Sequence, residues 1–288
     1  MQVDVAITRY PRRIVCLTEE TTETLYLLGE EERIAGVSGY TVRPPEARKK
    51  PRVSAFITAK FDKIMDLQPD LVLAFSDLQA GISAELIKRG VNVLTFNQRS
   101  VTEILQMMLT LGRIVGAGAK AEQLVGRLRE DLDAIAKSAE RLTFRPRVFF
   151  EEWFDPLISG IRWVDELIEI AGGTPIYPEL RDRKNAPERI VKPEEVAARD
   201  PEVVIASWCG RLVQKRLIRG RTNWGTVRAV QQGHIYEIKS TYILQPGPAA
   251  LTEGVRQVHA IIAKAAGGTV DPRLAPSEKL DRDLVTQK

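Results

Sequence analysis

An internal repeat restricts the possible folds of this chain more than any other feature of its sequence. The stretch around Asp70, IMDLQPDLVLAFS, is similar to the stretch around Glu202, VAARDPEVVIASW, which lies 132 residues further on. Arg13, at the start of the first apolar run, is matched by Arg147 after 134 residues. A repeat at this spacing predicts two similar lobes, because 288 residues are enough for about two domains of ~150 residues each.

Within each lobe, short apolar runs alternate with segments of helical periodicity. Continuously apolar runs are typical of strands that are buried on both faces of a parallel sheet. We expect strands at the following positions: Arg13–Thr18, Ile34–Ser38, Leu71–Phe75, Val91–Phe96, Arg147–Phe150 and Val203–Ser207. The alternation predicts the α/β fold class, with parallel sheets in two Rossmann-like lobes.

A proline-free helical segment separates the two halves of the repeat. It extends from Ser100 to Arg141, and only Gly116 and Gly118 interrupt its apolar periodicity. We interpret it as one long backbone helix that joins the lobes, with the glycines as the place for any break. The alternative is two ordinary packed helices of the first domain. The expected division is an N-terminal lobe, a connecting helix, a C-terminal lobe and a polar tail, at 1–98, 99–143, 144–266 and 267–288.

Composition excludes several classes of function. An excess of only four basic residues, scattered along the chain, argues against a nucleic-acid partner. With only two histidines and two cysteines, a zinc site built from several His and Cys ligands is nearly impossible, and so is a disulfide framework. No apolar run reaches the ~20 residues that span a bilayer, so we expect no membrane insertion. The first residues carry no secretory pattern. The expected location is therefore cytoplasmic as the sequence stands, or periplasmic if a leader was removed or the start is mis-assigned.

Aromatic residues gather where the expected strands end. Paired α/β lobes usually bind a ligand between the carboxyl ends of their strands. Aromatic residues form only 6% of the chain, yet seven lie at or just after these ends: Tyr40, Phe56, Phe75, Trp153, Phe154, Trp208 and Tyr242. Such walls suit a flat, largely apolar ligand. For each ring, the alternative is packing in the core of its own lobe.

The sequence supports catalytic residues less strongly than it supports an aromatic binding site. Glu151 and Glu152 are neighbours on a strand and point to opposite faces, so they would not share a site with each other. Cys209 has no histidine beside it in the sequence, and a lone cysteine is commonly a small buried apolar residue. No P-loop, GxGxxG, GxSxG or HExxH motif occurs. The basic stretch Arg211–Arg221 favours a solvated helix face over contact with an anionic ligand or partner.

Several segments resemble one known family. They are RIVCLTEETTETLYLLGEEERIAGVSGY, PPEARKKPRVSAF, DKIMDLQPDLVLAF, SGIRWVDELIEIAGG and HIYEI, and the likeness extends from Arg12 to Ala265. They resemble the vitamin B12-binding substrate-binding proteins of ABC importers. Those proteins belong to the class III, helical-backbone metal-receptor superfamily, which also carries haem and ferric siderophores. The resemblance implies a monomeric binding protein rather than an enzyme, with no intrinsic cofactor.

The resemblance also implies roles for particular residues. Five of the aromatic residues match positions that surround the corrin in the B12 binders: Tyr40, Phe56, Phe75, Trp153 and Tyr242. Asp62 and Glu194 occupy the places of the acidic residues that dock to the permease. The segments Trp208–Gly210 and Leu244–Gly254 resemble a subgroup without signal peptides that is labelled cobalamin-binding, in which Cys209 could ligate the metal as a soft thiolate.

The expected function is therefore binding of a cobalamin-like corrinoid or related metal chelate in the cleft between the two lobes. The protein would serve an ABC-type uptake system and its permease, or would be a cytoplasmic relative of such a receptor. The alternative is a cytoplasmic enzyme or metallochaperone that acts on a chelate through Cys209 and the acids Glu151, Glu152 and Asp155.

Overall fold

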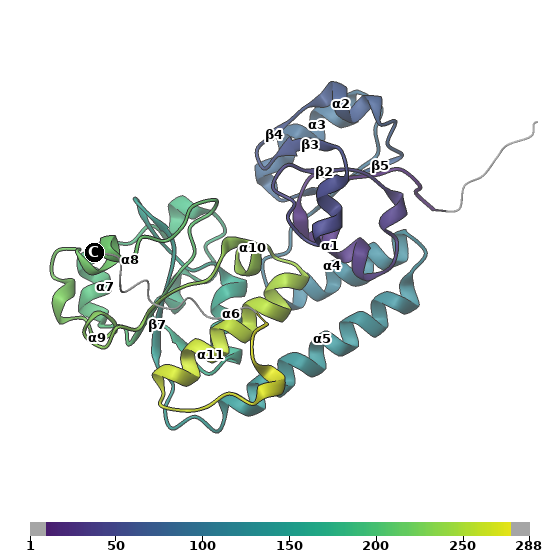
Figure 1. The fold of residues 1–288 in the computed structure, drawn as a ribbon. Helices are drawn as coiled ribbons and strands as arrows, with labels where there is room; N and C mark the ends of the chain where they lie inside the picture. The colour runs from purple at the N-terminus through teal and green to yellow at the C-terminus, as the bar shows by residue number, and fades with distance from the viewer. Residues whose placement is uncertain (1–9, 278–288) are drawn as a thin grey trace, which may run out of the picture. The chain divides into compact units, whose positions relative to one another are not determined.

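The computed structural model describes residues 10–277, and these form two compact units (Figure 1). Unit 1 contains 10–98 and Thr102–Arg127, and unit 2 contains Arg99–Val101 and 128–277. Both units combine helices with a sheet in which most strands are parallel, which confirms the predicted α/β class. The boundaries expected from the sequence stay a prediction, and the ends of the chain, 1–9 and 278–288, lie outside the described residues.

Unit 1 is built on a six-stranded sheet in the order β4-β3-β2-β1-β5-β6. Its strands are β1 (Ile14–Cys16), β2 (Ile34–Ser38), β3 (Arg52–Ala55), β4 (Thr58–Ala59), β5 (Leu71–Phe75) and β6 (Val93–Phe96). Its helices before the connecting segment are α1 (Glu19–Leu27), α2 (Phe61–Asp66) and α3 (Ala80–Lys88). Only β4 pairs in the antiparallel sense, with β3. The central strands β1 and β5 are buried throughout, as their apolar runs predict.

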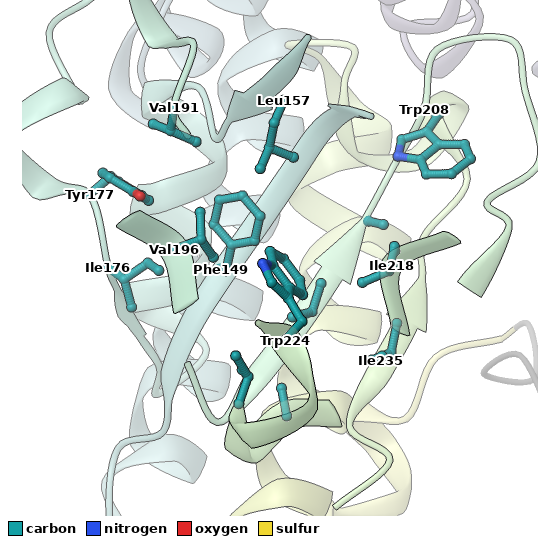
Figure 2. Close-up of a cluster of buried hydrophobic side chains, with 14 residues drawn as sticks. Phe149, Leu157, Ile176, Tyr177, Val191, Val196, Trp208, Ile218, Trp224 and Ile235 are labelled. Carbon is teal, nitrogen blue, oxygen red and sulfur yellow. The ribbon is translucent and has the colours of Figure 1, made fainter. Parts of the chain in front are cut away.

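Unit 2 contains a five-stranded sheet in the order β11-β10-β7-β8, with β9 also paired to β7. Its strands are β7 (Arg147–Phe154), β8 (Leu157–Ser159), β9 (Thr174–Pro175), β10 (Val203–Ala206) and β11 (Ile235–Glu237). Its helices are α6 (Arg162–Ile170), α7 (Pro193–Arg199), α8 (Lys215–Arg219), α9 (Arg228–Gln231), α10 (Ser240–Ile243) and α11 (Val255–Ala265). Figure 2 shows its aromatic core, in which Phe149 packs edge-on against both Trp224 and Tyr177.

The sequence repeat corresponds to a repeat of topology. The parallel strands β2-β1-β5-β6 of unit 1 have the same order and chain connections as β9-β7-β10-β11 of unit 2. Strands β5 and β10, which carry the most similar sequences, begin 132 residues apart at Leu71 and Val203. The two lobes are therefore versions of one α/β unit.

The helical segment between the repeats is divided at its glycines into α4 (Val101–Ile114) and α5 (Gly118–Ala139). Gly116 adopts a left-handed φ of 79°, which ends α4. A Cβ at Gly116 would lie 2.6 Å from the ring of Tyr10, so this turn also requires glycine for space. Helix α5 belongs to unit 1 up to Arg127 and to unit 2 from Leu128. No helix within 10–277 is both long and apolar enough to span a bilayer.

Candidate functional site

The loops after three strands of unit 1 carry apolar side chains that remain exposed. Tyr40 follows β2 and is 56% exposed, and Phe56 follows β3 and is half-buried. Ile57 and Leu78, in the loops after β3 and β5, are 66% and 52% exposed. Because β3, β2, β1 and β5 are parallel neighbours, these loops leave the same edge of the sheet. We call the four side chains the apolar rim. Phe75, the last residue of β5, is buried instead.

Gln79 fixes two of these loops to each other. Its Oε1 accepts a hydrogen bond from the backbone N–H of Phe75 at 2.9 Å, and its Nε2 donates to the carbonyl of Phe56 at 2.7 Å. The side chain is fully buried; its bond to Phe75 is shielded from water, and its bond to Phe56 is partly shielded. The loop after β5 begins at Ser76, whose Oγ accepts from the N–H of Leu78. The apolar rim is therefore held on a rigid support.

Two buried carboxyl groups lie at the same edge, at the start of α1. Glu19 and Glu20 follow β1 and are 8% and 3% exposed. Glu20 accepts from the hydroxyl of Thr18 at 2.7 Å, and Glu19 accepts from Ser38 at 3.3 Å. The Ser38 Oγ also accepts from the N–H of Tyr40, which connects the acids to the rim. No lysine or arginine within 10–277 forms an ion pair with either acid.

Burial is the main cause of the raised pKa values of Glu19 and Glu20. It raises the pKa of Glu20 to about 8, and the neighbouring charge of Glu19 raises it further while Thr18 opposes the shift. Burial also raises the pKa of Glu19, against hydrogen bonds from its own backbone and from Ser38. Near neutral pH the pair therefore retains a proton. It can both accept and donate hydrogen bonds.

The corresponding edge of unit 2 is aromatic. Trp153 and Phe154 end β7 and are half-buried, and Tyr242 in α10 is also half-buried. Trp208 follows β10 but is only 3% exposed, with its ring 5.2 Å from that of Phe154. Trp208 lies in the buried cluster drawn in Figure 2. The structure thus brings Trp208 and Phe154 together in one cluster against which Trp153 also packs.

A buried ion pair supports these rings. Glu151 of β7 is fully buried and accepts two hydrogen bonds from Arg221, at 2.6 and 2.9 Å, and one from Trp208 Nε1 at 3.0 Å. The guanidinium of Arg221 lies 4.7 Å from the ring centre of Trp224 and 5.8 Å from that of Phe154. Burial raises the pKa of Glu151, and the bonds from Arg221 oppose that rise. Glu151 therefore holds the aromatic edge in place.

The three acids of the enzymatic alternative do not converge. Glu152 pairs with the buried Arg189 at 2.5 and 3.2 Å, on the other face of the strand from Glu151. Asp155 lies exposed in the turn between β7 and β8, where its carbonyl accepts from Trp153 Nε1. The expectation that Glu151 and Glu152 point to opposite faces and do not share a site agrees with these contacts.

The cysteines and histidines are dispersed. Cys209 is exposed after β10, whereas Cys16 is buried in β1 and burial raises its pKa to about 12. His259 is fully buried between the carbonyl of Ala171 and the hydroxyl of Ser138. Over the described part of the chain, no three His, Cys, Asp or Glu side chains are grouped to hold a metal ion. A role for Cys209 as a metal ligand stays a prediction.

Asp62 and Glu194 are equivalent in the repeat. Each is the second residue of its helix, α2 or α7, and each helix precedes the corresponding strand, β5 or β10. Both side chains are exposed; that of Asp62 is 98% exposed and forms only a 3.4 Å pair with Arg89. Exposed acids at matching positions of two lobes suit contact with a basic surface.

Residues 14–242 match the profile of a family described as periplasmic binding protein. The chain therefore belongs to the periplasmic binding protein family, whose members are substrate-binding proteins of ABC transporters. It is accordingly a binding protein rather than an enzyme, and it carries a ligand instead of an intrinsic cofactor. Family membership also implies a small-molecule ligand and an ABC permease as partners.

Relatives with similar sequences include one whose name states a ligand and one whose name does not. The chain is 27% identical over 265 residues to an uncharacterized ABC transporter substrate-binding lipoprotein of Bacillus subtilis, covering 88% of this chain and 81% of that one. It is 24% identical to a cobalamin-binding protein of Halobacterium salinarum, covering 87% and 69%.

Solved structures share the fold. A periplasmic vitamin B12 binding protein of Vibrio cholerae matches with a TM-score of 0.71 at 23% identity, covering 88% of this chain and 98% of that one. A periplasmic heme binding protein of Pseudomonas aeruginosa matches with a TM-score of 0.78 at 19% identity, covering 91% and 96%. Similar folds thus accommodate different chelates.

Sequence reasoning missed four features of these edges. Ile57 and Leu78 escaped attention because single aliphatic residues in loops carry no pattern. Glu19 and Glu20 are acidic residues at the start of a helix, and only their burial distinguishes them from other such acids. The ligand-binding roles assigned to the seven aromatic residues stay predictions, with Phe75 and Trp208 the two that the structure buries.

Proposed function

We propose that this protein binds a cobalamin-like corrinoid or a related metal chelate at the strand ends of its lobes, as the monomeric substrate-binding component of an ABC-type uptake system. The observation that carries the proposal is the apolar rim. Side chains of this size are rarely left exposed together on a rigid support unless they meet a ligand. A flat macrocycle has the apolar faces that such a rim can cover.

The acidic pair favours a corrinoid among the possible chelates. A corrin carries a ring of amide groups, whose N–H groups donate to carboxyl oxygens, whereas haem carries carboxylates. In the described part of the chain Glu19 and Glu20 have no basic partner, so an anionic group brought beside them would be repelled. The half-protonated pair suits amide groups, which both donate and accept.

Titration of the purified protein with cyanocobalamin, haemin and ferrichrome tests the proposal. Tryptophan quenching and calorimetry would report binding, and we expect cyanocobalamin to bind with a Kd below ~100 μM and more tightly than the other two. If none of the three binds below that concentration, the proposal is wrong.

A matched pair of isoleucine variants tests the rim itself. Ile57 in the rim and Ile87 on α3 are similarly exposed, at 66% and 59%. We expect Ile57→Ala to weaken binding roughly fivefold to tenfold, because it removes apolar contact area, and Ile87→Ala to leave the Kd unchanged. Equal effects of the two changes would show that the ligand binds elsewhere.

We further propose that Asp62 and Glu194 dock the protein to its permease. The compartment is part of this proposal, because a receptor for uptake meets its permease outside the cytoplasm. The relatives named above include periplasmic and lipoprotein receptors. Cell fractionation, with detection of the native protein, distinguishes that location from the cytoplasmic one expected from the sequence.

A further inference from the structure

The basic stretch Arg211–Arg221 does not form the single solvated helix face that its sequence favours. Helix α8 covers only Lys215–Arg219, so Arg211 and Arg221 lie outside it. The side chain of Arg221 is 9% exposed and is neutralised by the carboxylate of Glu151. Arg211 is exposed, and no carboxylate within 10–277 pairs with it. The positive charge of Arg221 is therefore neutralised inside the fold, whereas the positive charge of Arg211 is available to a ligand.

The backbone at Arg211 is anchored to the buried part of the aromatic edge. Its N–H donates to the carbonyl of Trp208 at 3.2 Å, which closes a turn through Gly210 with a φ of 70°. Trp208 is in turn held by its hydrogen bond to Glu151. The position of Arg211 is thus set by a buried ion pair and by a turn that favours glycine.

The side chain of Arg211 extends over an aromatic surface. Its guanidinium carbon lies 5.8 Å from the ring centre of Trp153, at the carboxyl end of β7. A ring orients a guanidinium by cation–π attraction but does not cancel its charge. The N–H groups at the edge of the guanidinium therefore stay available to an anion, in the planar arrangement that matches two oxygens of a carboxylate or phosphate.

We propose that Arg211, supported on Trp153, binds an anionic substituent of the ligand, either a carboxylate or a phosphodiester. This inference rests on the proposed function, because it concerns the same ligand. It adds that Arg211, at the strand ends of unit 2, receives the anionic group of that ligand. Arg211 is then a specificity-determining residue.

Two pairs of ligands separate the anionic group from the macrocycle. Cyanocobalamin and dicyanocobinamide share the corrin and its amides, but only cyanocobalamin has the phosphodiester. Haemin and its dimethyl ester share the porphyrin, but only haemin has free carboxylates. Affinities are measured for the wild-type protein, for Arg211→Ala and Arg211→Lys, and for the control Arg216→Ala, which alters an exposed arginine of α8.

We call the pair that the wild-type protein binds more tightly the preferred pair. We expect Arg211→Ala to weaken binding of the anionic member of this pair about 10-fold to 100-fold, as for loss of a charged hydrogen bond. Binding of the neutral member should change less than about twofold, Arg211→Lys should restore part of the loss, and Arg216→Ala should resemble wild type. Added salt should weaken the anionic ligand's binding to wild type more than to Arg211→Ala.

The outcomes identify which statement fails. If the wild-type protein binds neither pair nor ferrichrome, the proposed function is wrong and this inference falls with it; if it binds ferrichrome alone, only this inference is wrong. If the wild type binds but Arg211→Ala weakens both members equally, or neither, the anion-binding role of Arg211 is wrong while the proposed function stands. Circular dichroism and the melting temperature of each variant confirm that it folds. The preferred pair shows whether the anion is a phosphodiester or a carboxylate.

Discussion

Glu19 and Glu20 show how much a single residue's environment decides at this site. Both follow a buried strand, both are themselves buried, and neither has a basic partner among residues 10–277. Placing a carboxylate in such surroundings costs free energy unless the group keeps its proton. Buried carboxyl groups at the edge of the sheet therefore lower the stability of the fold, but they are able to hydrogen-bond a ligand.

Glu20→Gln should stabilise the protein at alkaline pH. A carboxyl whose pKa is about 8 when folded and near 4.5 when unfolded binds more protons in the folded state between those values. The free energy of unfolding should therefore fall as pH rises through this window, by an amount on the order of a few kcal/mol. Urea unfolding at pH 5 and pH 8 measures this, and the gap between variant and wild type should widen at pH 8.

Glu23→Gln provides the control for this change. Glu23 lies on the same helix but forms a 2.8 Å ion pair with Arg43, so its removal should give no such gain at alkaline pH. If Glu20→Gln and wild type lose stability in parallel between pH 5 and pH 8, the raised pKa of Glu20 is incorrect.

The strands and helices themselves show which local patterns are informative. The buried strands β2 and β5 lie where their apolar runs predict. The shorter strands β4, β8 and β9 were not predicted, because two or three residues carry no periodicity. Pairing with a longer neighbour stabilises each of them.

The contact between α4 and α5 depends on one glycine. A Cβ at Gly112 of α4 would clash with the Cβ of Ala121 of α5. We expect Gly112→Ala to destabilise the protein by about 1–3 kcal/mol through overpacking, although alanine favours helix. Adding Ala121→Gly should recover part of the loss, as measured by urea unfolding.

Gly126 of α5 is the matched control, since a Cβ there would meet no atom within 4 Å. Gly126→Ala should stabilise by about 0.5–1 kcal/mol through helix propensity alone. If both glycine variants stabilise equally, close packing at Gly112 is not required.

For the whole molecule, the repeat provides two copies of one α/β unit with surface acids at matching places. The permease-docking proposal predicts that Asp62→Lys and Glu194→Lys each reduce ligand uptake by cells roughly tenfold, because each places a like charge opposite a basic partner surface. The Kd for ligand should not change.

Asp66→Lys, at the other end of α2, is the control for this experiment. It alters the charge of unit 1 by the same amount and should leave uptake near the wild-type level. Docking through Asp62 would be contradicted if Asp66→Lys impaired uptake as strongly, since the effect would then reflect net charge alone.

The sequence by itself determined the α/β class, the two related lobes and the strand ends where the candidate site residues gather. The fold class and the strand ends follow from periodicity, which is a local pattern. The two lobes follow from a repeat, which is visible when two segments of the sequence are compared. Only the tertiary structure decided that Trp208 and Phe75 are buried, that Glu151 is paired with Arg221, and that Arg211 has no carboxylate partner among residues 10–277. Burial and charge pairing depend on residues such as Glu151 and Arg221, which are 70 positions apart in the chain, and no local pattern records such contacts.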